Sequence, residues 1–151
     1  MGSSSGSRGV SVLGRRGTDL LAQVPLFEGL GRRDLKRITE HADEISYRQH
    51  EAIVEAGQSG GSFYVIVEGE VKVVQGSKVL TRLGPGEFFG EISLLDGGPR
   101  TATVVAETPV TAIRIFKESF EKAVAQEPSV AAKILAVVAR RLREAERHLN
   151  D

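Results

Sequence analysis

The feature that most constrains the fold is a series of short β-rich runs, punctuated by glycine, across the middle of the chain. The runs cover residues 44–47, 52–55, 63–67, 71–74, 79–83, 103–106 and 111–116. Glycines between them, such as Gly57, Gly69 and Gly76, suit tight turns with positive φ. Strands that recur about every 8–12 residues are typical of a sandwich or barrel, and not of a parallel βαβ sheet. We therefore expect a mainly β domain.

Helical patterns flank the β-rich region. Before it, apolar residues recur at helical spacing over 18–24, until Pro25 ends the first helix, and again to about residue 41. After it, a helix is expected from Lys117 to the break at Glu127 and Pro128, and Ser129 can cap a final helix. The predicted fold is a double-stranded β-helix (a jelly-roll-like β-roll) with N-terminal helices and two C-terminal helices.

This pattern divides the chain into two parts. Residues 1–17 open with a Ser- and Gly-rich stretch and are expected to be a disordered leader or an artificial tail. Residues 18–151 form the predicted domain, with N-terminal helices over 18–42, the β-roll over 43–116 and the last helices over 117–151.

The final helix carries an apolar stripe whose members recur at alternating spacings of three and four. The stripe consists of Leu135, Val138, Leu142, Ala145 and Leu149. Two heptads are too few to define a coiled coil. Two interpretations stay open: the stripe packs on the chain's own β-roll, or it forms the seam of a homodimer.

Composition excludes several function classes. Lys plus Arg and Asp plus Glu each number 20, so no basic excess indicates nucleic acid as a general partner. The absence of cysteine excludes disulfides, thiolate metal sites and a thiol nucleophile, and agrees with a reducing, cytoplasmic location. The longest apolar run, residues 134–139, is far below the roughly 20 residues that span a bilayer.

One segment between the β-rich runs combines residues that suit a phosphate. Gly90 allows a turn that exposes backbone amides at the start of a short helical turn, where N–H groups can face an anion. Arg100 follows a Gly-Gly-Pro turn, and a guanidinium is the side chain that best matches phosphate oxygens. Glu91 is unfavourable beside an anion unless it binds another group, such as a sugar hydroxyl. The residues by themselves indicate a phosphosugar ligand.

The order of residues in this segment closely resembles the phosphate-binding cassette of cyclic-nucleotide-binding domains. That family includes catabolite activator proteins, regulatory subunits of cyclic-AMP-dependent kinase and cyclic-nucleotide-gated channels. Its pattern is Phe-Gly-Glu, an apolar residue, Ser or Ala, Leu, then a loop that ends in Pro-Arg, a small residue and Ala. The matching positions, within residues 89–102, are Phe89, Gly90, Glu91, Ile92, Ser93, Leu94, Pro99, Arg100, Thr101 and Ala102.

The resemblance implies a role for each part of the cassette. Glu91 and the Gly90 backbone would bind the ribose 2′-OH, and Arg100 would bind the cyclic phosphate. Three further backbone amides would complete the phosphate site, those near Ile92, Ser93 and Ala102.

The resemblance also implies a pocket for the base, on the strands opposite the cassette. Its expected lining residues are Val73, Leu80 and Thr81. Thr101, directly after the arginine, is compatible with cyclic AMP and with cyclic GMP. Cyclic AMP is the favoured ligand, and no other cofactor is expected.

Two apolar residues correspond by resemblance to the family's switch. When phosphate draws the cassette inward, Leu94 would vacate space that Phe120 enters. The helix that begins at Lys117 would then swing, and the final helix would close over the base. This exchange would relay ligand binding to the C-terminal helices.

Other functions have less support in the sequence. A degenerate β-roll that binds no nucleotide would usually lack the arginine or the glutamate, and both are present. A cupin-like enzyme would need clustered histidines, whereas His41, His50 and His148 fall on separate segments. No Gly-x-Ser-x-Gly elbow supports hydrolysis. We expect a sensor and not an enzyme.

The effector that such a sensor controls is not identified by the sequence. In catabolite activators a DNA-reading module follows the last helix, and this chain has no room for one, so no nucleic-acid binding is expected through it. The arginines of the final helix alternate with Glu144 and Glu146, as on a solvated helix face.

Overall fold

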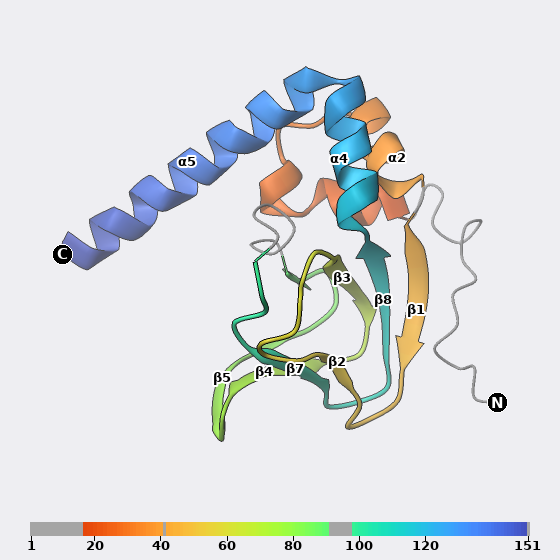
Figure 1. The fold of residues 1–151 in the computed structure, drawn as a ribbon, viewed down its shortest axis with the longest axis vertical. Helices are drawn as coiled ribbons and strands as arrows, with labels where there is room; N and C mark the ends of the chain where they lie inside the picture. The colour runs from red at the N-terminus through yellow and green to blue at the C-terminus, as the bar shows by residue number, and fades with distance from the viewer. Residues whose placement is uncertain (1–16, 41, 91–97, 151) are drawn as a thin grey trace.

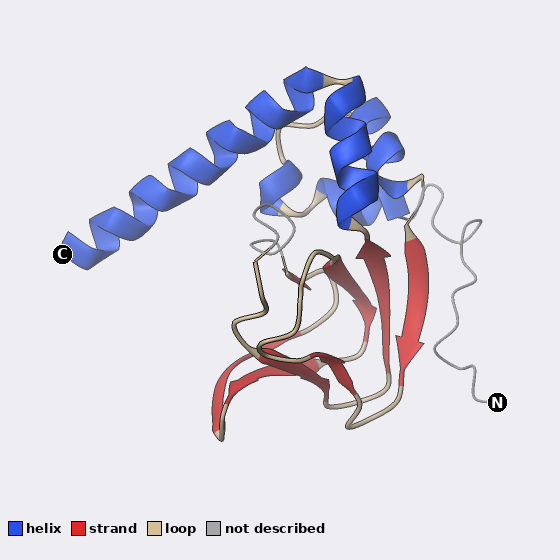
Figure 2. Cartoon of the chain, in the orientation of Figure 1, coloured by secondary structure: helices blue, strands red, loops and turns tan. Residues whose placement is uncertain are grey.

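The computed structural model describes residues 17–40, 42–90 and 98–150. Two antiparallel sheets face each other, with strand orders β1-β8-β3-β6 and β2-β7-β4-β5 (Figures 1 and 2). The first sheet contains β1 (Asp43–Tyr47), β8 (Val110–Ile115), β3 (Phe63–Glu68) and β6 (Phe88–Phe89). The second contains β2 (Ala52–Val54), β7 (Thr103–Ala106), β4 (Val71–Gln75) and β5 (Lys78–Leu83). The predicted mainly β fold with flanking helices is confirmed.

The helices gather at one end of the sheets (Figure 2). Residues 17–22 are helical, followed by η2 (Pro25–Phe27), α2 (Arg32–Thr39), α4 (Lys117–Gln126) and α5 (Pro128–Asn150). Each predicted strand is present to within about two residues. β6 was not expected, because a pair of residues is too short to show the period of two that marks a strand.

Two apolar clusters hold these layers together, and β3 contributes to both. Phe63 and Val65 pack with the helices, beside Phe27 of η2 and Phe120 of α4. Tyr64 and Ile66 point to the opposite side and pack between the two sheets. Successive side chains of a strand alternate between its faces, so one strand can join both clusters.

A close approach between two turns requires glycine at Gly69. Its φ is +92°, and a Cβ at this position would lie 2.2 Å from the carbonyl oxygen of Pro109. The turn after β3 therefore packs directly against the turn between β7 and β8. The same contact is closed by a hydrogen bond, in which the Glu70 amide donates to the Thr108 hydroxyl at 3.0 Å.

Helix α5 begins at Pro128, one residue earlier than the predicted cap at Ser129, because proline is accepted in the first turn of a helix. The early part of α5 is anchored to the helical end of the domain by Val130 and Ile134, which are buried in the cluster there. An ion pair between Lys133 and Asp34 of α2, at 3.6 Å, adds to this contact.

Beyond these anchors α5 leaves the body of the protein (Figure 1). Leu135 is 68% exposed and Leu142 is 61% exposed. The interpretation that their stripe packs on the chain's own β-roll is therefore wrong for these residues. Val130 and Ile134 face the cluster under the helices instead, and of the stripe itself Val138 packs against that cluster.

None of the helices among the described residues combines the length and the apolarity that a bilayer span requires.

Candidate functional site

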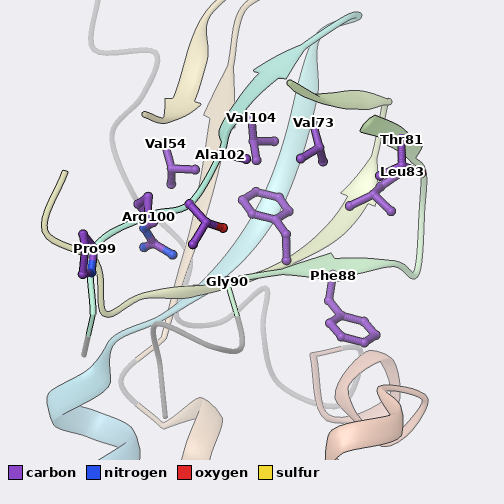
Figure 3. Close-up of a pocket in the computed structure, with 12 residues that line it drawn as sticks. Val54, Val73, Thr81, Leu83, Phe88, Gly90, Pro99, Arg100, Ala102 and Val104 are labelled. Carbon is purple, nitrogen blue, oxygen red and sulfur yellow. The ribbon is translucent and has the colours of Figure 1, made fainter. Parts of the chain in front are cut away.

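A cavity of about 320 Å³ opens on the inner face of the second sheet, next to β6 and the segment that follows residue 98. Most of its walls are apolar, and Arg100 is the charged residue among the described residues that line it (Figure 3). Six lining residues were expected from the sequence: Val73, Thr81, Gly90, Arg100, Thr101 and Ala102. The structure therefore brings β2, β4, β5, the β6 segment and residues 99–104 together around one hollow.

The backbone of Arg100 is held by the loop between β2 and β3, residues 55–62. The Gly57 amide donates to the Arg100 carbonyl at 2.8 Å, and the Arg100 amide donates to the Gln58 carbonyl at 2.9 Å. An antiparallel bridge pairs Ser59 with Pro99. These hydrogen bonds fix the backbone of Arg100, although the residue lies outside the named strands.

The guanidinium of Arg100 is buried, with 9% of the residue exposed. Its Nη2 donates to the Ser62 carbonyl at 3.0 Å. Its Nη1 is buried and has no hydrogen-bond partner in the described part of the chain. A buried N–H group without a partner is costly, and an anion in the cavity would satisfy it.

Burial lowers the pKa of Arg100, while the Tyr64 side chain acts in the opposite direction. Among the described residues no carboxylate forms an ion pair with it. Burying a cation without a counter-charge costs free energy. An anionic ligand binds favourably at such a cation, because its negative charge offsets the cost of removing the cation from water.

Gly90 lies against this guanidinium with a φ of +93°. A Cβ at Gly90 would lie 2.7 Å from the Ser62 carbonyl oxygen and 2.9 Å from Arg100 Nη1. The glycine therefore has a packing role beside the turn role that the sequence predicts. Because Gly90 has no side chain, the end of β6 can pack directly against the guanidinium of Arg100.

The wall opposite Arg100 is a row of side chains that crosses the second sheet. Val54 pairs with Val104, Val104 pairs with Val73, and Val73 pairs with Thr81. All four line the cavity. Cross-strand partners point to the same face of a sheet, so strand register assembles this wall.

Leu80 was expected beside Thr81 and does not line the cavity; it is 46% exposed. Along β5, Thr81 and Leu83 face the cavity, whereas a β-bulge between the pairs Val73–Thr81 and Val74–Val79 leaves Leu80 out of that row.

Six lining residues were missed as pocket residues by sequence reasoning: Val54, Leu83, Phe88, Phe89, Pro99 and Val104. Phe89 and Pro99 belong to the cassette pattern, which could have indicated them. The others depend on strand register or on a strand of two residues, and neither is visible in the sequence.

The described lining of the cavity does not account for every expected functional residue. Glu91, Ile92, Ser93 and Leu94 lie outside the described residues. Phe120 is 6% exposed and packs in the cluster under the helices. No three His, Asp or Glu side chains of the described residues lie close enough to hold a metal ion.

Comparison with known proteins agrees with this geometry. The family profile described as the cyclic nucleotide-binding domain matches residues 44–127. The crystal structure of the N-terminal domain of a transcriptional regulator from Streptomyces coelicolor A3(2) is similar to this one, with a TM-score of 0.80 and 32% identity. The match covers 87% of this chain and 95% of that domain.

Two curated bacterial regulators are similar in sequence. The cyclic AMP receptor protein of Thermus thermophilus is 34% identical over 131 residues, which is 83% of this chain and 61% of the relative. The CRP-like cAMP-activated global transcriptional regulator of Mycobacterium tuberculosis is 28% identical over 138 residues, 88% of this chain and 62% of the relative. This chain thus spans about three fifths of their length. Together with the profile match and the architecture, these similarities show that the chain belongs to the cyclic nucleotide-binding domain family.

Proposed function

We propose that this domain is a regulatory sensor that binds cyclic AMP in preference to cyclic GMP and relays binding through its C-terminal helices. The observation that carries the proposal is Arg100, a buried guanidinium in the wall of a mostly apolar cavity, whose Nη1 has no hydrogen-bond partner among the described residues. A cyclic nucleotide combines one negative charge with an apolar-faced base, which matches that combination. The preference for cyclic AMP draws on the relatives, two of which are described as cyclic AMP receptors or as cAMP-activated.

Each residue has a role in this proposal. Arg100 binds the cyclic phosphate, helped by the amides near Ile92, Ser93 and Ala102, and Glu91 with the Gly90 backbone binds the ribose. The base lies against the cross-sheet row from Val54 to Thr81, where apolar contacts supply affinity. Thr101 lies at the phosphate side of the cavity.

The relay to the C-terminal helices rests on how α4 and α5 are held. Phe120 is buried between the sheet and the helices, so a change in its packing would move α4. Among the described residues, none from α5 lines the cavity. We expect ligand to draw the cassette and Leu94 inward, Phe120 to follow, and α5 to approach the base.

The proposal assigns no chemistry to the ligand. The proteins that resemble this chain are regulators, and the charged residue among the described lining residues is a cation that cannot act as a general base. The bound nucleotide is expected to leave unchanged. A cytoplasmic location and the absence of nucleic-acid binding through this chain stay predictions, and the proposal names no effector.

A homodimer through α5 is also proposed. The exposed leucines Leu135 and Leu142 are seven residues apart on one helix face, the spacing of a two-helix seam. An apolar row that the body of the protein does not cover is typical of an association surface.

Isothermal titration with cyclic AMP and with cyclic GMP tests the proposed function directly. The wild-type domain should bind both, with the lower Kd for cyclic AMP. Arg82→Leu is a matched control for Arg100→Leu, because Arg82 lies on the second sheet with its side chain 60% exposed and outside the cavity lining. Binding that survives Arg100→Leu unchanged, or no binding by the wild type, would reject the proposal in favour of a β-roll module without a nucleotide.

A further inference from the structure

Tyr64 lies beside the arginine of the cavity and was not among the expected site residues. It is 5% exposed and points between the two sheets from β3. It pairs with Phe89 of β6 in the strand register, and the two rings are stacked, with centroids 4.9 Å apart and an angle of 9° between their planes. The neighbour directly after Phe89 is Gly90, the residue that lies against Arg100. The ring of Tyr64 is therefore held by stacking on Phe89, in the strand that leads into Gly90.

The guanidinium of Arg100 approaches the ring of Tyr64. Its Cζ lies 5.9 Å from the ring centroid, within the range of a cation–π contact. The Ser62 carbonyl, two residues before Tyr64, accepts the hydrogen bond from Nη2. One short piece of β3 and its preceding loop thus contacts the guanidinium in two ways. Gly90 lies on a third side, and Nη1 is the guanidinium group that has no hydrogen-bond partner among the described residues.

Tyr64 also lies near Tyr47 of β1: burial raises the pKa of the Tyr47 phenol, and the neighbouring Tyr64 adds to that rise. The Tyr64 ring itself is restrained at its face by Phe89. A ring held in this way can restrain a cation that lies against it.

We propose that Tyr64 is a positioning residue for Arg100, whose ring and neighbouring Ser62 carbonyl hold the guanidinium with Nη1 directed at the ligand's phosphate. The proposal rests on the proposed function, since the group that Tyr64 orients is the one assigned to the phosphate. An arginine side chain has many rotamers, and a binding site gains affinity when the productive one is selected before the ligand arrives. The π face also offsets part of the charge of a buried cation that lacks a carboxylate partner among the described residues.

The first test uses the protein without ligand. Restricted rotation of a guanidinium separates its Nη–H resonances, and the Arg100 resonances can be assigned by their loss in Arg100→Lys. We expect separate Arg100 resonances in the wild type and in Tyr64→Phe, and averaged ones in Tyr64→Leu. Averaged resonances in the wild type, or unchanged ones in Tyr64→Leu, overturn the proposal. This result does not depend on whether a nucleotide binds.

Phe63→Leu is the matched control, because Phe63 is the adjacent aromatic residue of the same strand and faces the helical cluster. It should lower stability without averaging the Arg100 resonances. If Tyr64→Leu does not fold, nuclear Overhauser contacts in the wild type between the Tyr64 ring protons and the Arg100 Nη protons decide. Their absence overturns the proposal.

The second test is the affinity for cyclic AMP by titration. Tyr64→Leu should raise the Kd by about tenfold, and Tyr64→Phe should change it by less than about threefold, because the ring and not the hydroxyl contacts the cation. In an Arg100→Lys background the effect of Tyr64→Leu should fall to less than about threefold, since its action passes through the guanidinium. An equal effect in both backgrounds overturns the positioning role. A wild type that does not bind rejects the proposed function, while the ligand-free test still decides the role of Tyr64.

Discussion

Gly90 and Arg100 are packed so closely that a methyl group does not fit between them. A Cβ on Gly90 would lie 2.9 Å from Arg100 Nη1 and 2.7 Å from the Ser62 carbonyl oxygen that accepts from the same guanidinium. A side chain at Gly90 therefore disturbs the guanidinium of Arg100 directly. Its effect on ligand binding can be separated from the effect of backbone strain on stability.

The first prediction is that Gly90→Ala loses both stability and affinity. The positive φ and the close contacts should together lower the free energy of unfolding by about 2–4 kcal/mol. Gly86→Ala is the matched control, because Gly86 has a φ of +85° and nothing within 4 Å of its Cβ position. It should cost about 1 kcal/mol, by thermal or urea denaturation, and leave the Kd unchanged. Equal losses in the two variants would show that strain alone matters at Gly90.

The second prediction is that Arg100→Leu removes affinity while the domain stays folded. A desolvated contact between a guanidinium and a phosphate contributes about 2–5 kcal/mol, so the Kd for cyclic AMP should rise by about 30- to 3,000-fold. The melting temperature without ligand should stay level or rise, because the variant no longer buries a cation whose Nη1 has no partner in the described part of the chain. A melting temperature that falls by more than about 5 °C would assign Arg100 a structural role instead.

The third prediction separates two leucines of β5. Leu83 lines the cavity, whereas Leu80 faces away and is 46% exposed. Leu83→Ala should lose about 1–2 kcal/mol of binding energy, a rise of about 5- to 30-fold in Kd. Leu80→Ala should change the Kd by less than about twofold. The reverse order of effects in a calorimetric titration would show that β5 presents its other face to the ligand.

The fourth prediction concerns the relay. The chain has no cysteine, so Lys78→Cys and Arg143→Cys can carry spin labels on β5 and on α5 without further changes. Cyclic AMP should shorten the distance between the labels, since α5 is expected to approach the base. Leu94→Ala should keep most of the affinity and reduce that shift, a loss of about 1–3 kcal/mol of coupling. The same shift in wild type and Leu94→Ala, or none in either, contradicts the relay.

The fifth prediction concerns association through α5. The double variant Leu135→Glu and Leu142→Glu should be monomeric at concentrations where the wild type sediments as a dimer, because charge in an apolar seam opposes pairing. Ala132→Glu and Ala136→Glu together provide the control, since both alanines are exposed on α5 beside the leucine row. A monomeric wild type at millimolar concentration would reject the seam.

Local signals in the sequence determined the fold class, the strand runs and the position of the cassette. Strand length, β-branched composition and turn glycines are properties of a few adjacent residues, so they can be read without tertiary contacts. The expectation that Arg100, Gly90 and Ala102 share one site came from a motif whose residues are close in sequence. The structure places all three in one cavity wall.

Tertiary structure decided what contacts those residues. The row from Val54 to Thr81 exists because strands far apart in sequence pair in one register, and a shift by one residue would turn every member away. A β-bulge in β5 left Leu80 out of the pocket row, and helix packing turned Val137 inward and left Leu142 exposed. Tyr64 contacts Arg100, which lies 36 residues later in the chain, because β3 pairs with β6 and so comes close to the segment that carries Arg100. Residue type and spacing reveal which ligand chemistry a chain can provide. Long-range strand pairing decides which side chains face the ligand site, because the packing of the whole domain with the lowest energy sets that pairing.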